Sequence, residues 1–132
     1  MLMRTAALLT STWLLISSAL ADPVARIASP NGGIVVEIDI NGEGRASYAI
    51  SRDGAPVIAP SRLGFLFVNA PKFERNLELT SQSSRSFNQR WEQPWGEQRF
   101  VRNHYNELRA TFSERNGTRR RFDVVFRVYD DG

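Results

Sequence analysis

The feature that most constrains this chain is an alternation of apolar and polar residues with a period of two, interrupted by short turn sequences. From Ile34 to Ile40 every second residue is isoleucine or valine, and the same period recurs in 99–114 and from Phe122 to Val128. Such alternation is typical of strands with one buried face. Because no segment after residue 21 keeps helical apolar spacing for more than two turns, the pattern predicts an all-β fold.

Turn sequences separate the expected strands at intervals that suit an antiparallel sandwich. Asn-Gly, Gly-Gly and Asp-Gly steps occur at 31–33, 41–42, 53–54 and 116–117, and these residues tolerate the positive φ of tight hairpin turns. The spacing predicts an all-β, antiparallel β-sandwich that opens with a meander of strands at 34–40 and 46–51. Prolines favour edge strands or corners in 56–67. The segment 69–89 has the weakest pattern, with only a weak strand predicted at 77–81.

The first 21 residues predict export from the cell. Arg4 precedes an apolar stretch at 6–16, and Ala19-Leu20-Ala21 forms the small-x-small pattern of a signal-peptidase site. Serines and threonines interrupt a stretch that is too short for a membrane anchor, which needs about 20 apolar residues. We therefore expect a signal peptide at 1–21, a mature domain at 22–132 with no membrane span, and a periplasmic or extracellular location.

Composition excludes several classes of function. The chain has no cysteine, so an exported domain must be stabilised by burial without disulfides. Its net charge is only +3, and its one dense basic run, 119–121, lies beside an Asn-Gly turn; nucleic-acid binding would need a basic face with base-reading residues. With one histidine and no nucleophile-elbow, zinc-protease or phosphate-loop motif, no catalytic residue is assigned from motifs.

One stretch, "WEQPWGEQRFVRNHYNEL" at 91–108, concentrates residues that contact ligands in other proteins. Trp91 and Trp95 precede a predicted strand, and their indoles can either close the end of the sandwich or stack on a sugar ring. His104 and Asn106 lie in the polar middle of one face of that strand. Since buried polar groups need hydrogen-bond partners, these two are either satisfied polar groups at a sheet edge or contacts in a cavity.

The three glutamates of this stretch, Glu92, Glu97 and Glu107, raise the question of glycosidase chemistry. That chemistry needs two carboxyl groups roughly 5 to 9 Å apart, and sequence spacing alone does not establish such a pair. Solvated or arginine-paired carboxylates explain the same residues.

Four segments carry a family resemblance. "SPNGGIVVEIDI", "DGAPVIAPSRLGF", "WEQPWGEQRFVRNHYNELRATF" and "FDVVFRVYDDG", in that order, resemble the N-terminal region of glycoside hydrolase family 97. The resemblance covers essentially all of 22–132. It implies a supersandwich similar to the galactose mutarotase fold, followed by a catalytic (β/α)8 barrel and a small C-terminal β-domain. It also implies hydrolysis of α-glucosidic or α-galactosidic bonds, and calcium near the active site.

The resemblance implies that the catalytic groups and most calcium ligands lie in or beyond the barrel, so no catalytic or metal residue is assigned to this chain. We expect a non-catalytic sandwich portion of a secreted α-glycosidase that supports the barrel, with α-linked oligosaccharide as substrate of the parent. Trp91, Trp95, His104 and Asn106 are the candidate contacts with sugar or barrel. The alternatives are a free-standing secreted carbohydrate-binding module, whose platform would be the tryptophan loop, and a non-catalytic interaction protein of the export pathway.

The last residues, "YDDG", directly follow a strongly apolar strand. This predicts that the sheet continues and that the sandwich within 22–132 is incomplete. On that view Phe126 and Val128 are exposed beside an unpaired edge, and the isolated chain is expected to aggregate.

Overall fold

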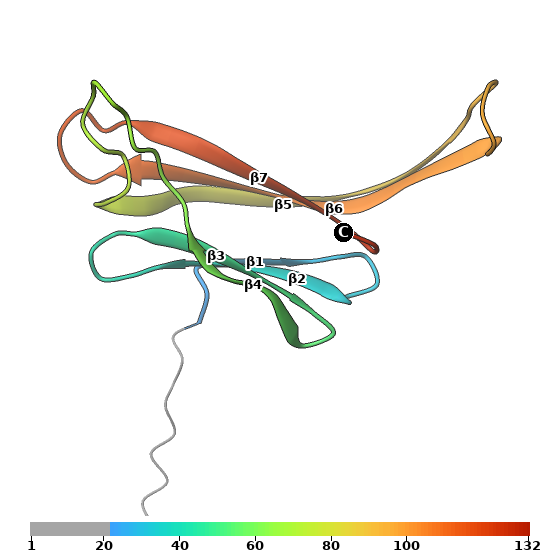
Figure 1. Ribbon diagram of the computed structural model, residues 1–132, viewed down its shortest axis with the longest axis horizontal. Coiled ribbons are helices and arrows are strands. Elements are labelled where there is room, and N and C mark those ends of the chain that lie inside the picture. The colour runs from blue at the N-terminus through green and yellow to red at the C-terminus, as the bar shows by residue number, and fades with distance from the viewer. Residues whose placement is uncertain (1–21) are drawn as a thin grey trace, which may run out of the picture.

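The computed structural model describes residues 22–132, which contain seven strands and no helix (Figure 1). The predicted signal peptide lies outside the described residues. The strands are β1 (Ala25–Ala28), β2 (Ile34–Ile40), β3 (Ala46–Arg52), β4 (Ala55–Arg62), β5 (Leu77–Glu92), β6 (Phe100–Glu114) and β7 (Arg121–Tyr129).

The strands form two antiparallel sheets stacked as two layers (Figure 1). One sheet has the order β1-β2-β3-β4 and the other has the order β5-β6-β7, so within each sheet every strand pairs with its neighbour in the sequence. The segment after β4 crosses from the first sheet to the second. The predicted antiparallel β-sandwich is confirmed.

The tight turns lie where the sequence places them. Asp53 and Gly54 both have positive φ, of 49° and 80°, as a primed hairpin turn between β3 and β4 requires. Gly117 has a φ of 75° in the turn between β6 and β7. β4, which contains Pro56 and Pro60, is an edge strand of its sheet, where a missing N–H is tolerated.

Strand β5 is where the sequence prediction was too short. The structure extends it over 16 residues, Leu77–Glu92, in place of the weak strand expected at 77–81. Its middle is rich in serine and glutamine and is exposed on both faces, so it has no apolar alternation. The segment is a strand because it pairs almost residue for residue with β6, from Leu77 opposite Glu114 to Glu92 opposite Phe100.

The core lies between the two sheets. Val36, Ile38, Leu77 and Phe112 are the largest side chains that are fully buried there. Val128, expected to be exposed, is instead 3% exposed. Phe126 is half-buried, and the centre of its ring lies 5.6 Å from the centre of the Tyr48 ring. The expectation was wrong on Val128 because β7 packs across β2 of the opposite sheet.

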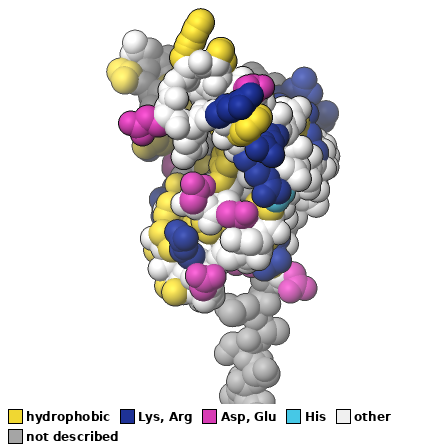
Figure 2. Space-filling view, turned by 90° about the vertical axis from the view of Figure 1, so that its right-hand side faces the viewer, with side chains coloured by type: hydrophobic (Ala, Val, Ile, Leu, Met, Phe, Trp, Pro, Cys, Tyr) yellow, Lys and Arg dark blue, Asp and Glu magenta, His cyan; other side chains and the backbone are white. Residues whose placement is uncertain are grey.

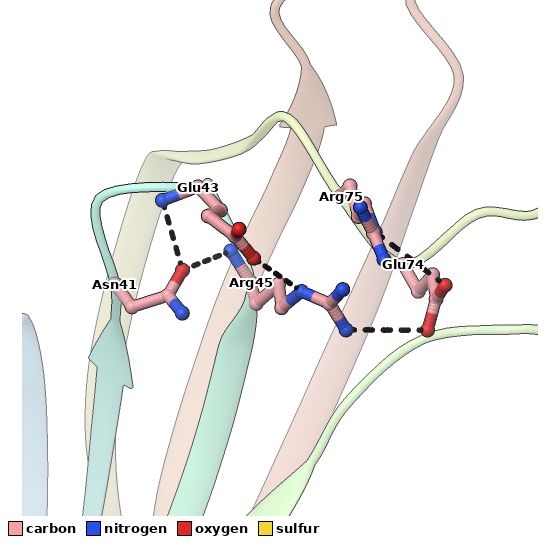
Figure 3. Close-up of polar contacts among 5 residues, drawn as sticks. All are labelled: Asn41, Glu43, Arg45, Glu74 and Arg75. Atoms are coloured by element: carbon pink, nitrogen blue, oxygen red, sulfur yellow. Dashed lines mark hydrogen bonds and ion pairs between the residues drawn. The ribbon is translucent and has the colours of Figure 1, made fainter.

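The turn between β2 and β3 is held by a set of polar contacts (Figure 3). The Oδ1 of Asn41 accepts hydrogen bonds from the backbone N–H groups of Glu43 and Arg45, at 3.1 and 2.9 Å. The guanidinium of Arg45 pairs with the carboxylate of Glu43 at 2.8 Å and lies 3.8 Å from that of Glu74, which precedes β5. Arg45 therefore connects this turn to the segment that enters the second sheet.

Backbone hydrogen bonds make the same connection at Gly44. The N–H of Leu77 donates to the carbonyl of Gly44 at 2.8 Å, and the N–H of Asn76 donates to that of Glu43 at 3.1 Å. Gly44 has a φ of 69°, and a Cβ there would lie 2.7 Å from both the Cα of Asn76 and the nitrogen of Leu77. Glycine is needed at this position because the two chain segments approach so closely.

Replacing this glycine should loosen the junction between the sheets. We expect Gly44→Ala to lower the free energy of unfolding by about 2 kcal/mol or more, because left-handed strain and a backbone clash add. Gly117→Ala is the matched control: its φ is similar, but its Cβ would meet nothing within 4 Å. It should cost only about 1 kcal/mol. Urea unfolding followed by tryptophan fluorescence measures both, and equal costs would contradict the proposed close approach.

Candidate functional site

Strands β5 and β6 continue beyond the sandwich as a two-stranded ribbon. β7 accompanies β6 only as far as the pair of Tyr105 with Tyr129, whereas β5 and β6 remain paired out to Glu92 and Phe100. Figure 1 shows this ribbon projecting well past the rest of the molecule. We call residues 88–104 the arm. It carries three of the four predicted contact residues.

Both tryptophans of the arm are exposed. Trp91 lies on β5 opposite Val101 and is 52% exposed, and Trp95 lies in the loop at the tip and is 63% exposed. Neither indole belongs to the hydrophobic core of the sandwich. Both are therefore available for contact with a ligand or another domain.

The four predicted residues do not converge on one face. Residues directly opposite each other in neighbouring strands share a face, and successive residues alternate. His104 pairs with Asn88, and Asn106 pairs with Ser86, on the face that continues into the core. We call this the inner face. Trp91 points to the opposite, outer face, so it cannot act together with His104 on one small ligand.

Asn106 connects the two sheets. Its Nδ2 donates a hydrogen bond to the carbonyl of Ala28 in β1 at 2.8 Å, and its Oδ1 accepts one from the hydroxyl of Ser86 at 2.6 Å. Both ends of the amide are thus engaged within the domain. Asn106 stays a candidate contact residue, but the interaction it makes here is structural.

The inner face of the arm also presents two arginines that the sequence analysis did not select. Arg90 and Arg102 are directly opposite each other and form the next pair on this face toward the tip, after Asn88 and His104. The guanidinium of Arg90 lies 4.0 Å from the ring centre of Phe100, and the Nε of Arg102 donates to Asn88 at 3.2 Å. The signal that could have found this pair is the hairpin register about Gly96, which required recognising the outer half of β5.

On the outer face, three charged residues form a row where the arm leaves the sandwich; we call this place the root of the arm. Arg85, Glu107 and Arg127 lie side by side on β5, β6 and β7. Glu107 is buried, with only 3% of the residue exposed. Its carboxylate accepts hydrogen bonds from the Nε of both arginines, each at 2.8 Å. The hydrogen bond from Arg127, together with that from Arg85 and both positive charges, lowers the pKa of Glu107 below its ordinary value of 4.5 despite its burial.

A second row on the outer face, next to the charged one, holds three aromatic rings in contact, the first pair stacked and the second tilted. The ring centres of Phe87 and Tyr105 are 4.8 Å apart, and those of Tyr105 and Tyr129 are 5.0 Å apart. Arg85 covers Phe87 at 4.5 Å, and Arg127 lies 5.6 Å from the ring of Tyr105. The two rows hold the three strands together at the point where β7 ends.

Glu92 and Glu107 do not form a hydrolytic pair. Glu92 pairs with Arg99 at 2.8 Å near the tip, whereas Glu107 lies seven residues along β6 from Phe100, about 23 Å in a strand. That separation exceeds the roughly 5 to 9 Å that glycosidase carboxyls need. Within residues 22–132, no group of three or more histidine, aspartate or glutamate side chains is arranged to hold a metal ion. No helix in this range is long and apolar enough to cross a membrane.

Comparison with known families identifies the domain. Residues 27–132 match the family model of the glycosyl hydrolase 97 N-terminal domain. The chain belongs to glycoside hydrolase family 97. A curated relative, the retaining alpha-galactosidase of Bacteroides thetaiotaomicron, is 29% identical over 106 residues, which are 80% of this chain and 15% of the relative.

Solved structures of the family have the same fold. Family 97 enzymes from Pseudoalteromonas sp. strain K8, in complexes with panose and with acarbose, superpose with a TM-score of 0.72 at 33% identity. The match covers 80% of this chain and 16% of those enzymes. A β-arabinopyranosidase, with a TM-score of 0.68 at 23% identity, shares the fold. The chain thus spans about a sixth of the length of these relatives.

Glu107 should make stability depend on pH. Because its pKa is lowered in the folded state, the stabilisation it provides is present above its unfolded pKa, near 4.5, and is lost as the pH falls through the folded value. Glu107→Gln should therefore unfold at lower urea than the wild type at pH 7, and the difference should shrink below about pH 4. Urea titrations of both proteins from pH 7 to pH 3 would show this; a constant difference would contradict it.

Asn106 should matter for stability. We expect Asn106→Ala to lower the free energy of unfolding by about 1 to 3 kcal/mol, because the carbonyl of Ala28 loses its partner from β6. His104→Ala, two residues away on the same face, serves as the control and should change it by only about 0.5 kcal/mol. If Asn106→Ala unfolded like the wild type but weakened oligosaccharide binding, Asn106 would instead be a ligand contact.

Proposed function

We propose that this chain is the exported, non-catalytic N-terminal sandwich of an α-glycosidase that hydrolyses α-glucosidic or α-galactosidic bonds. The observation that carries this proposal is the family match over 27–132 in a chain that spans about a sixth of its relatives. The relatives include a retaining alpha-galactosidase and an enzyme bound to panose. Export rests on the signal peptide predicted at 1–21.

The domain's role on this proposal is to support the catalytic barrel. Glycoside hydrolysis requires two carboxyl groups held rigidly on either side of one bond. In the described residues, Glu92 is engaged by Arg99 near the tip of the arm and Glu107 by Arg85 and Arg127 at its root. On this proposal the catalytic carboxyls belong to the later part of the parent. The calcium ion that the resemblance implies would be held there as well.

A second role is favoured by the exposure of Trp91 and Trp95 at the tip of the arm. Exposed indoles are suitable platforms for the apolar face of a sugar ring. The arm would then contribute to carbohydrate binding, either within the parent enzyme or as a free-standing secreted module.

Hydrolysis of panose and of an aryl α-galactoside by the full-length gene product tests the main proposal. We expect activity in the full-length enzyme, no activity in the chain 22–132 alone, and reduced activity with faster thermal inactivation when 22–132 is deleted. Turnover by 22–132 alone, or a full-length product inactive on α-glycosides, would overturn the proposal.

The carbohydrate-binding role is tested separately by titrating the chain 22–132 with panose. Saturable binding that disappears in Trp91→Ala/Trp95→Ala would support that role. Trp13 lies in the predicted signal peptide, so neither the chain 22–132 nor its double variant contains it. Absence of binding would limit the domain to support of the barrel.

A further inference from the structure

Two like charges face each other on the inner face of the arm. Arg90 and Arg102 are register partners, and like charges directly opposite each other destabilise a strand pair. Within residues 22–132, no carboxylate forms an ion pair with either one. The arginines at the root are different, because Arg85 and Arg127 share Glu107. The domain therefore neutralises its arginines at the root and leaves this pair without an acidic partner.

Both guanidinium groups are held in place while keeping donors free. Arg90 stacks at 4.0 Å on the ring of Phe100, and stacking uses the face of the guanidinium, so its N–H edge stays available. Arg102 uses only its Nε, toward Asn88. The planar N–H fork of an arginine matches a carboxylate in a two-bond geometry. Figure 2, which looks onto the end of the molecule that carries the arm, shows a run of Lys and Arg side chains at that end.

The surroundings of the pair fit a protein surface. The arm is a ribbon that projects past the first sheet (Figure 1); Phe100, on the inner face, and Trp95, in the tip loop, are exposed on it. Tryptophan and arginine are the residue types that contribute most to protein–protein contacts, whereas sugar and small-molecule sites are usually concave.

We propose that the inner face of the arm docks on an acidic surface of the catalytic portion of the same polypeptide, with Arg90 and Arg102 binding Asp or Glu carboxylates there. This inference rests on the proposed function, since it requires the longer parent enzyme. The family enzymes have about five-sixths of their length outside the region matched here, which supplies the partner. Phe100 orients Arg90, and the exposed Trp95 in the tip loop lies at the far end of the contact.

Hydrogen exchange of the arm amides in the full-length enzyme tests the docking. We expect the amides of 88–104 to be protected in the wild type and to exchange about ten-fold faster in Arg90→Glu/Arg102→Glu, because carboxylates would then face carboxylates. Arg90→Lys/Arg102→Lys keeps the charge and should change the rate less. The matched control is Arg119→Glu/Arg121→Glu, which changes one arginine of the β6–β7 turn and the first residue of β7. Neither arginine has an ion-pair partner in the described residues. This control should leave the arm unchanged.

The outcomes separate the two proposals. An arm that exchanges equally fast in the wild type and in Arg90→Glu/Arg102→Glu, in an enzyme that hydrolyses panose, overturns the docking and leaves the proposed function standing. An equal effect of the control variant also overturns it, because the response would be to net charge. Protection that appears only when oligogalacturonate is added assigns the pair to an anionic sugar and overturns the docking as well. A full-length product without α-glycosidase activity overturns the proposed function whatever the arm does.

Discussion

Face-to-face packing of the two sheets is the interaction on which the rest of this domain depends. The chain has no cysteine, so burial and hydrogen bonding alone keep the layers together. Side chains such as Ile38 and Phe112 fill the space between them. At one end Gly44 brings the β2–β3 turn against the start of β5, and further along Asn106 reaches across to β1. Loss of this packing would release both the core and the base of the arm.

The arm exists because one hairpin is longer than the sandwich that covers it. Between Asn106 and Phe112 the inner face of β6 changes from polar to fully buried. That change coincides with the end of the opposite sheet, since Asn106 bonds to Ala28, the last residue of β1. Beyond this point the ribbon has only its own pairing, and the charged and aromatic rows at its root fix its direction.

The sequence predicted strands β2 and β3 of the first sheet well, indicated β4 only as an edge strand or corner, and missed β1; the second sheet it predicted unevenly. Strand β2 alternates cleanly because one of its faces is buried and the other is not, and the Asp-Gly turn after β3 needs positive φ that few other pairs tolerate. The outer part of β5 has no such pattern, since both of its faces meet solvent. Its strand character comes from its partner β6, which is distant in sequence, and the period of a single segment cannot report that pairing.

The residues of the contact surface were predictable in type but not in arrangement. The concentration of tryptophan, arginine and asparagine in 91–108 is visible in the sequence, and so are the sandwich class and the family resemblance. Only the register of β5 on β6 placed Arg90 opposite Arg102 and put Trp91 on the other face from His104. Only the stacking of the sheets engaged Asn106 and buried Val128. Alternation and turn chemistry are local, so the sequence determines them; pairing register and the packing of layers depend on distant segments, so the tertiary structure decides them.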